Sequence, residues 1–330
     1  MDGGGDLIPP ERKKFSEADR AHFFNSLDYI TYISYNKTMR KISLSGFGAI
    51  ERIGADRFFA LASRMGFDAI DFALYQGNKR LILDLGVEGS PEEQGETIRR
   101  IAERHGLVIG QTHAPFGFRA GDAPEEEILE VYRNAARATR ALGASKMVVH
   151  PIKFDDCANG YRQQECFDLN LRVFERLGPT LRECGVKAML ENMFITIRVQ
   201  NVPVLVRTIY STGEELARAA DALGEEFGVC LDSGHALITG EDIPETVRAI
   251  GNRLGVLHLH DNDHERDDHL PPYLGELDFD ALMRALKEVG YSGNINFEVD
   301  FVRIPEELLE IQMRYLHEVG LRFRRILDGE

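Results

Sequence analysis

The feature that most constrains the fold of this chain is a regular alternation of short apolar runs with amphipathic segments. Eight apolar runs predict strands near 41–45, 68–74, 107–113, 146–150, 187–192, 228–232, 255–260 and 294–299. Apolar residues recur at helical spacing between them, for example over 124–142, 167–184, 214–227, 244–253, 279–289 and 305–327. This alternation predicts an α/β fold, a single (β/α)8 TIM barrel domain over residues 41–330.

A doubly wound open sheet is the alternative for the same order of elements. No GxGxxG motif follows the first predicted strand, which disfavours the dinucleotide-binding form of that fold. Residues 1–40 precede the alternation, and we expect them to form an N-terminal arm whose role the sequence does not assign.

The composition narrows the classes of partner. Lys and Arg number 39 against 54 Asp and Glu, a net charge of −15. Such a chain repels a phosphate backbone, so no nucleic-acid partner is expected. No apolar run approaches the roughly 20 residues that span a bilayer, and the first residues lack a secretory pattern. The expected location is therefore cytoplasmic, without a membrane partner, and a homo-oligomer stays open.

Five of the apolar runs turn polar at their carboxyl ends. In a parallel barrel, these are the strand ends at which catalytic groups gather. The polar residues there are His150, Glu191, Asp232, His258 with His260, and Glu298. Taken singly, Asp232 could merely cap a helix, and the two histidines near 259 could be hydrogen-bonded core residues. The recurrence of the pattern favours one shared site.

Glu191, Asp232, His260 and Glu298 are predicted to bind one divalent cation. Carboxylate oxygens suit hard cations and imidazole adds selectivity, so Mn²⁺ is the first choice and Mg²⁺, Co²⁺ or Zn²⁺ are alternatives. Salt bridges inside the barrel are the structural alternative. Apolar neighbours would make the two glutamates costly to bury without a cation, which disfavours that alternative.

The strand-end segments also form an ordered set over about residues 41–300. They are Thr112-His113-Ala114-Pro115, Val149-His150-Pro151, Leu190-Glu191-Asn192, Leu231-Asp232-Ser233-Gly234-His235, His258-Leu259-His260-Asp261-Asn262-Asp263, Asp268-His269-Leu270-Pro271, Leu274-Gly275-Glu276-Leu277-Asp278 and Phe297-Glu298. Each segment alone is a weak signal, but their joint order is fairly specific. It resembles the xylose-isomerase-like TIM-barrel superfamily, in particular its sugar-phosphate isomerase/epimerase branch, which includes ketose 3-epimerases and the related AP endonucleases.

The resemblance implies a metal-dependent sugar or sugar-phosphate isomerase/epimerase. Its chemistry would be proton transfer through a metal-stabilised enediolate. The resemblance implies the same four metal ligands, with Glu191 and Glu298 as the acid/base pair. It gives His235 a place beside the substrate oxygens. The further candidates for substrate binding are His113, His150, Asp267 and His269.

Several alternatives stay open within this resemblance. A sugar lyase, dehydratase or deglycosidase would use the same metal site. An AP-endonuclease-like phosphodiester hydrolase is the rival, because His113, His150, Asp267 and His269 match positions that AP endonucleases use to hold additional zinc ions. A non-catalytic metal- or sugar-binding subunit is less favoured, since both glutamates are present. Lys153, Arg198 and Arg303 are the basic residues expected nearest the barrel mouth. Each could meet a substrate phosphate, but a solvated surface charge is the favoured role for each of them.

Overall fold

The structure, a computed structural model, describes residues 40–75 and 89–329. The predicted arm lies outside the described residues, apart from Arg40. Among the described residues, eight strands form one parallel sheet in the order β10-β1-β2-β3-β4-β5-β8-β9. They are β1 Ile42–Ser45, β2 Ala69–Ala73, β3 Val108–His113, β4 Lys146–Val149, β5 Lys187–Glu191, β8 Phe227–Asp232, β9 Leu254–His258 and β10 Ile295–Phe297. A bridge between Leu259 and Phe297 joins the two ends of this order, so the predicted (β/α)8 barrel is confirmed.

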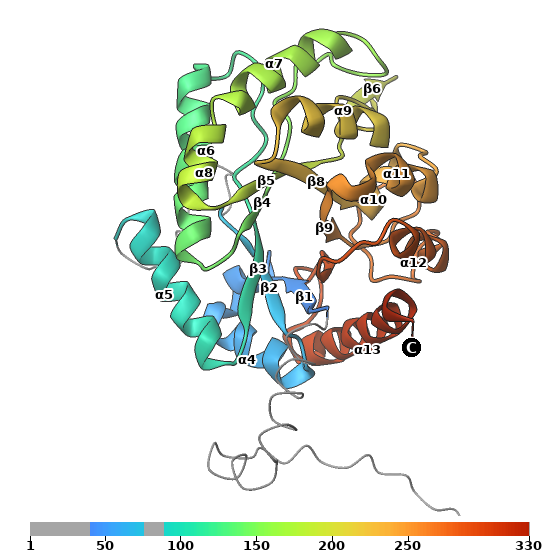
Figure 1. The fold of residues 1–330 in the computed structure, drawn as a ribbon. Coiled ribbons are helices and arrows are strands. Elements are labelled where there is room, and N and C mark those ends of the chain that lie inside the picture. Colours follow the sequence, from blue (N-terminus) through green and yellow to red (C-terminus); the bar gives the residue numbers. More distant parts are fainter. Residues whose placement is uncertain (1–39, 76–88, 330) are drawn as a thin grey trace, which may run out of the picture. The chain divides into compact units, whose positions relative to one another are not determined.

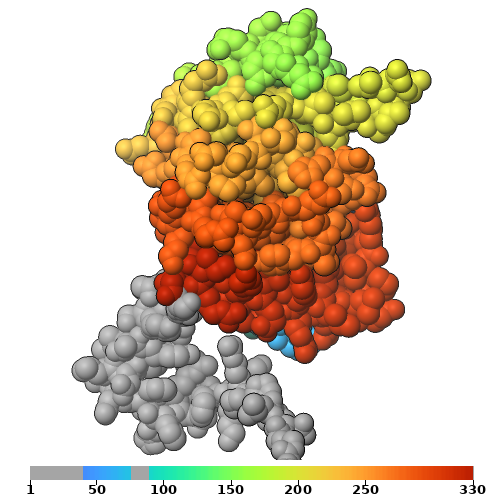
Figure 2. All heavy atoms as spheres, turned by 90° about the vertical axis from the view of Figure 1, so that its right-hand side faces the viewer, coloured from blue at the N-terminus to red at the C-terminus, as the bar shows by residue number. Residues whose placement is uncertain are grey.

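Helices surround the strands on the outside of the barrel (Figure 1). They are α3 Ala49–Ile53, α4 Ala55–Met65, α5 Pro91–Arg104, α6 Glu125–Ala141, α7 Gln163–Glu175, α8 Gly178–Cys184, α9 Gly213–Leu223, α10 Ser233–Ile238, α11 Ile243–Ile250, α12 Phe279–Glu288 and α13 Leu309–Asp328, with 3-10 turns η1 Gly251–Arg253 and η2 Glu306–Leu308. Orange and red atoms, which belong to the C-terminal part of the chain, cover much of the face in Figure 2. None of the described helices is long and apolar enough to cross a membrane.

Two elements differ from the sequence prediction. The helix expected over 167–184 is two helices, α7 and α8, because Pro179 stands at the start of α8 and cannot continue a helix from the preceding turn. The antiparallel hairpin of β6 Phe194–Val199 and β7 Val202–Arg207 was not predicted. Its two turn residues, Gln200 and Asn201, have positive φ angles of 50° and 67°, as a tight hairpin turn requires.

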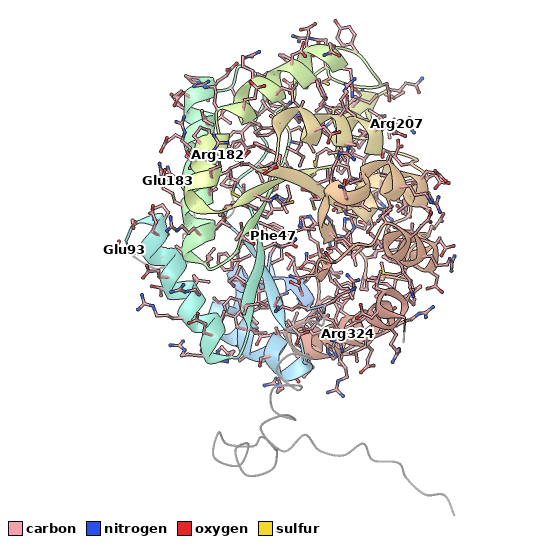
Figure 3. The ribbon with its side chains drawn as sticks, in the orientation of Figure 1. Phe47, Glu93, Arg182, Glu183, Arg207 and Arg324 are labelled. Atoms are coloured by element: carbon pink, nitrogen blue, oxygen red, sulfur yellow. The ribbon has the colours of Figure 1, made fainter. Side chains whose placement is uncertain are left out.

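The barrel interior is built in layers of inward-facing side chains. Val148, Met189, Cys230 and Val256 form a small buried cluster, separate from the larger core between strands and helices. Side chains alternate along a strand, so the residues two positions later also face the barrel axis, nearer its carboxyl end. These later residues are His150, Glu191, Asp232 and His258. Charged residues such as Glu93, Arg182 and Arg324 instead lie on the outer helices (Figure 3).

Candidate metal centre and active site

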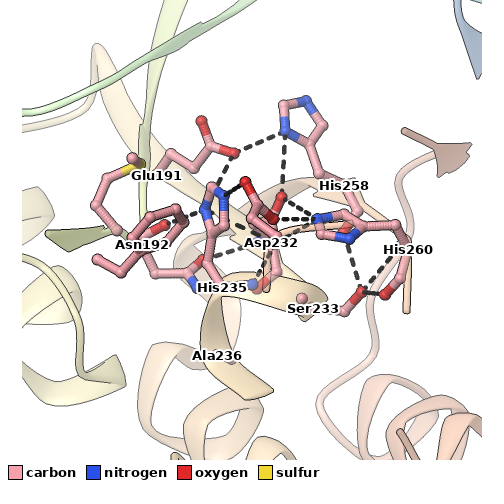
Figure 4. A network of polar contacts seen from close by, with 12 residues as sticks. Glu191, Asn192, Asp232, Ser233, His235, Ala236, His258 and His260 are labelled. Atoms are coloured by element: carbon pink, nitrogen blue, oxygen red, sulfur yellow. Dashed lines mark hydrogen bonds and ion pairs between the residues drawn. The ribbon is translucent and has the colours of Figure 1, made fainter. Parts of the chain in front are cut away.

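Four acidic and imidazole side chains meet at the carboxyl end of the barrel. Glu191, Asp232, His258 and Glu298 each offer a ligand atom, and these atoms lie within 4.8 Å of one another. The Nδ1 atom of His258 lies 2.8 Å from Glu191 Oε1, 3.0 Å from Glu298 Oε2 and 4.0 Å from Asp232 Oδ2. Figure 4 shows Glu191, Asp232 and His258 turned toward one another. This group therefore contains the three predicted carboxylates.

The fourth member of the group is His258, whereas the sequence analysis assigned that place to His260. His258 pairs in register with Asp232 across β8 and β9, which places the two side by side. His260 follows the end of β9, and its Nε2 atom lies 3.0 Å from the Asp232 carboxylate. Both histidines have the same strand parity, so the sequence pattern alone does not separate them.

Asp232 combines the capping role and a place in the cluster. Its Oδ1 atom accepts a hydrogen bond of 2.7 Å from the backbone N–H of His235, which caps the short helix α10. Asn192 fixes the end of β8 by bonding the backbone N–H and carbonyl of Asp232 at 2.7 and 2.8 Å. The carboxylate still faces both His258 and His260, so the capping interpretation does not exclude metal binding.

Glu191 also belongs to a second group, with His113 and His150. The two Nε2 atoms of these histidines are 3.0 Å apart, and they lie 3.4 and 2.7 Å from Glu191 Oε2. That oxygen is buried and has no hydrogen bond among the described residues. Burial lowers the pKa of His150 to about 4, so its ring is neutral near pH 7 and keeps a free electron pair. Burial lowers the pKa of His113, but the hydrogen bond and charge of Glu191 outweigh burial and raise it, so His113 must lose its proton before these three side chains can hold a cation.

A third group lies beside the first and consists of His235, His260, Asp267 and His269. The Asp267 carboxylate lies 3.5 Å from His235 Nε2 and 3.3 Å from His269 Nε2. Burial alone would lower the pKa of His235, but the charges of Asp232 and Asp267 outweigh burial and raise this pKa to about 10. The backbone of His269 has a φ of 47°, an uncommon value for a residue other than glycine. This conformation accompanies a ring stacked 3.9 Å from that of His260.

A buried carboxylate that the sequence analysis missed supports His258 from below. Asp71, on β2, places Oδ2 3.1 Å from His258 Nε2. The same oxygen accepts hydrogen bonds of 3.0 Å from Gln111 Nε2 and 3.0 Å from Asn296 Nδ2. An acid inside the apolar strand Ala69–Ala73 was the signal in the sequence. Asp71 thus lies against one nitrogen of the imidazole, while the other nitrogen faces the acidic group, as a carboxylate that supports a metal-binding histidine would.

A cavity of ≈ 290 Å³ opens above these groups. All five predicted substrate-binding candidates line it, together with both predicted catalytic glutamates: His113, His150, Glu191, His235, Asp267, His269 and Glu298. Aromatic residues form much of the remaining wall: Phe47, Tyr75, Phe116 and Phe194. Asp232, His258 and His260 are fully buried. The hairpin strand β6 supplies part of the wall, which the sequence analysis did not foresee.

Of the basic residues expected near the mouth, Lys153 lines the cavity together with Arg119, which was not singled out from the sequence. Arg303 instead lies on the surface, 75% exposed, and pairs with Asp300 and Asp268. Arg198 is exposed on the hairpin.

The geometry of this barrel agrees with comparisons to known proteins. A family model described as "Xylose isomerase-like TIM barrel" matches residues 59–319. The chain belongs to this family. Protein y4fM of Sinorhizobium fredii is 25% identical over 291 residues, 81% of this chain and 88% of that protein.

Two other similar proteins carry names that belong to the resemblance described from the sequence. "Probable endonuclease 4" of Shouchella clausii is 24% identical over 294 residues, 79% of this xylose isomerase-like chain and 90% of that protein. A crystal structure described as a "D-tagatose 3-epimerase-like protein" superposes with a TM-score of 0.64 at 20% identity, and covers 88% of this chain and 98% of its own. At this identity the structural likeness shows the fold alone.

Proposed function

We propose that the chain is a divalent-metal-dependent isomerase or epimerase of a sugar or sugar phosphate. The observation that carries this proposal is the position of two carboxylates, Glu191 and Glu298, on the wall of one small cavity directly above a group of ligand side chains. A cavity of ≈ 290 Å³ is close to the lower limit of typical small-molecule pockets, about 300 Å³. The cavity therefore suits a compact substrate.

In this proposal, Glu191, Asp232, His258 and Glu298 hold the catalytic cation. The ligand atoms of these four side chains lie close together, and three carboxylates around one imidazole repel each other in a buried site unless a cation lies between them. The mixture of carboxylate and imidazole suits Mn²⁺, Co²⁺, Fe²⁺ or Zn²⁺ better than Ca²⁺. When bound, such a cation supplies positive charge that stabilises negative charge developing on substrate oxygens.

The acid/base chemistry falls to side chains that reach the cavity. Glu298 is 13% exposed and Glu191 is 1% exposed, so Glu298 is the more accessible base for a carbon-bound proton. In the metal-free protein, burial raises the pKa of Glu298, but the charge of protonated His258 outweighs burial and lowers this pKa. When a cation is bound, His258 must be neutral, and the charge of the cation would favour the ionised carboxylate in its place. Glu191 serves as the partner acid, and His235 donates a hydrogen bond to a substrate oxygen.

Incubation with ketoses in deuterated water tests this proposal. The Mn²⁺-loaded protein is expected to exchange one carbon-bound hydrogen of at least one neutral or phosphorylated ketose, as detected by NMR. Products that have lost water or a leaving group would instead indicate the lyase, dehydratase or deglycosidase alternatives. Absence of both exchange and elimination across the panel contradicts the proposal.

Replacing Asp71 by asparagine is expected to weaken metal binding by about 10–100-fold, the usual effect of losing a carboxylate that supports a metal-binding histidine. The Asp71 carboxylate contacts His258 but lines no part of the cavity. Titration with Mn²⁺ measures the loss. The matched control is Asp68→Asn, which removes a carboxylate bonded to the backbone N–H of Ile42. Equal affinities in wild type and Asp71→Asn would remove Asp71 from this role.

A metal-dependent phosphodiester hydrolase is the second candidate. The observation that favours it is the presence of several overlapping or adjacent groups of ligand side chains, three of which contain Glu191. A similar chain carries the name "Probable endonuclease 4". The net charge of −15 opposes duplex binding. Incision of duplex DNA with an abasic site, lost on replacing His113 or His269, would establish this function in place of the isomerase.

A further inference from the structure

Two basic side chains lie next to each other on the wall of the cavity. Arg119 follows β3 and Lys153 follows β4, and a parallel bridge joins the two residues. The backbone N–H of Ala120 donates to the Lys153 carbonyl at 2.9 Å, which fixes the two segments against each other. Both side chains line the same cavity as Glu191 and Glu298. A ligand that reaches the carboxylates of Glu191 and Glu298 therefore lies in the same cavity as the side chains of Arg119 and Lys153.

The charges of these two side chains are poorly matched by the protein. Lys153 is 8% exposed, and its Nζ atom donates to the carbonyl of Phe194 at 3.0 Å. It has no carboxylate partner in the described ranges. Burial, helped by the neighbouring charge of Arg119, lowers the pKa of Lys153 to about 7. A buried ammonium group without an anion is costly, so this arrangement is stabilised when an anion approaches.

Arg119 adds a second donor to the same place. Its Nε atom lies 3.3 Å from the Asp155 carboxylate, which is 88% exposed and therefore screened by water. Its Nη1 atom is buried and has no hydrogen-bond partner in the part of the chain that the structure describes. A guanidinium and an ammonium group that line the same cavity are the kind of donors that bind phosphate and carboxylate oxygens.

We propose that Arg119 and Lys153 form a subsite for an oxyanionic group of the substrate, a phosphate or a carboxylate. The inference rests on the proposed function and deepens it, since it assigns an anionic sugar derivative as the substrate class. Lys153 could instead have a purely structural role, in which its ammonium group donates to the carbonyl of Phe194 and positions β6. That role does not require a guanidinium group nearby. The pairing of two cations at one wall of the cavity distinguishes the subsite from that structural role.

Calorimetric titration of the metal-loaded protein with inorganic phosphate, and separately with acetate, tests the subsite. Lys153→Met and Arg119→Met are each expected to weaken binding of the preferred anion at least tenfold, and Lys153→Arg is expected to keep it. Any contact between the anion and bound metal is the same in all variants. The ratio of the anion affinity of a variant to that of wild type therefore measures the contribution of the subsite. The control is Arg198→Gln, which removes an exposed cation whose one hydrogen bond within the described residues goes to the carbonyl of Asn201.

The two anions separate a phosphate subsite from a carboxylate subsite. Unchanged affinity for both anions in folded Lys153→Met and Arg119→Met overturns the proposal, as does loss of binding in Lys153→Arg equal to that in Lys153→Met. These outcomes do not depend on turnover, so the subsite can fail while the isomerase activity stands. If a substrate is turned over, Lys153→Met is expected to raise KM for the anionic sugar and not for its neutral analogue.

Discussion

Glu191→Ala is expected to remove metal from two groups of ligands at once. The two oxygens of Glu191 face different partners: Oε1 lies 2.8 Å from His258 Nδ1, and Oε2 lies 2.7 Å from His150 Nε2. The loss of affinity is expected to exceed the roughly 10–100-fold that follows loss of a supporting residue, because a direct ligand disappears. Elemental analysis after gel filtration gives the number of metal ions per chain in each variant.

The variant His113→Ala separates a site with one metal ion from a site with several. His113 belongs to the group of His150 and Glu191 but is not one of the four ligands proposed for the catalytic cation. If wild type holds one ion per chain and His113→Ala keeps it, the two histidines serve substrate binding, as the sequence analysis predicted. If His113→Ala loses one ion of several, the multi-metal hydrolase gains support. Glu241→Ala, which removes a partly buried glutamate paired with Arg207, is the control. Full metal content in Glu191→Ala would exclude Glu191 from both groups.

The sequence was sufficient to predict the barrel because strand parity and helical spacing are local properties. All eight predicted strands lie in the ring, and the family comparison agrees with the resemblance. The same parity explains the cluster: residues two positions after an inward-facing residue reach the barrel axis near its carboxyl end, and this preceding residue is Met189 for Glu191, Cys230 for Asp232 and the buried Asn296 for Glu298. Glu191, Asp232 and Glu298 could therefore be brought together from the sequence alone.

Parity could not decide between His258 and His260, which both satisfy it. Which of them approaches Glu191 and Glu298 depends on tertiary packing: His258 lies 2.8 and 3.0 Å from those carboxylates, whereas His260 contacts Asp232. The hairpin β6–β7 and the cation Arg119 were missed for a related reason. They lie in connections between strands and helices, and their approach to the cavity follows from tertiary packing rather than from a repeating pattern.

Glu298→Gln is expected to reduce turnover by about 10²–10⁴-fold, the usual contribution of a positioned acid or base. Glutamine keeps the size of the side chain and one carbonyl oxygen, so it can still occupy its place beside His258. It cannot accept a proton from carbon near neutral pH. The rate of hydrogen exchange between the substrate and deuterated water measures the step directly, without requiring net conversion.

Loss of metal would mimic loss of the base, because Glu298 is also a proposed ligand. Rates are therefore compared at saturating Mn²⁺ with the bound metal measured in the same sample. Glu215→Gln is a matched control, since this glutamate is half-buried, bonds Gln163 and lies outside the three ligand groups. A fully metallated Glu298→Gln protein that exchanges substrate hydrogen at the wild-type rate would show that Glu298 does not move the proton. Glu191 would then be the base, because it lines the same cavity and belongs to the same ligand group as Glu298.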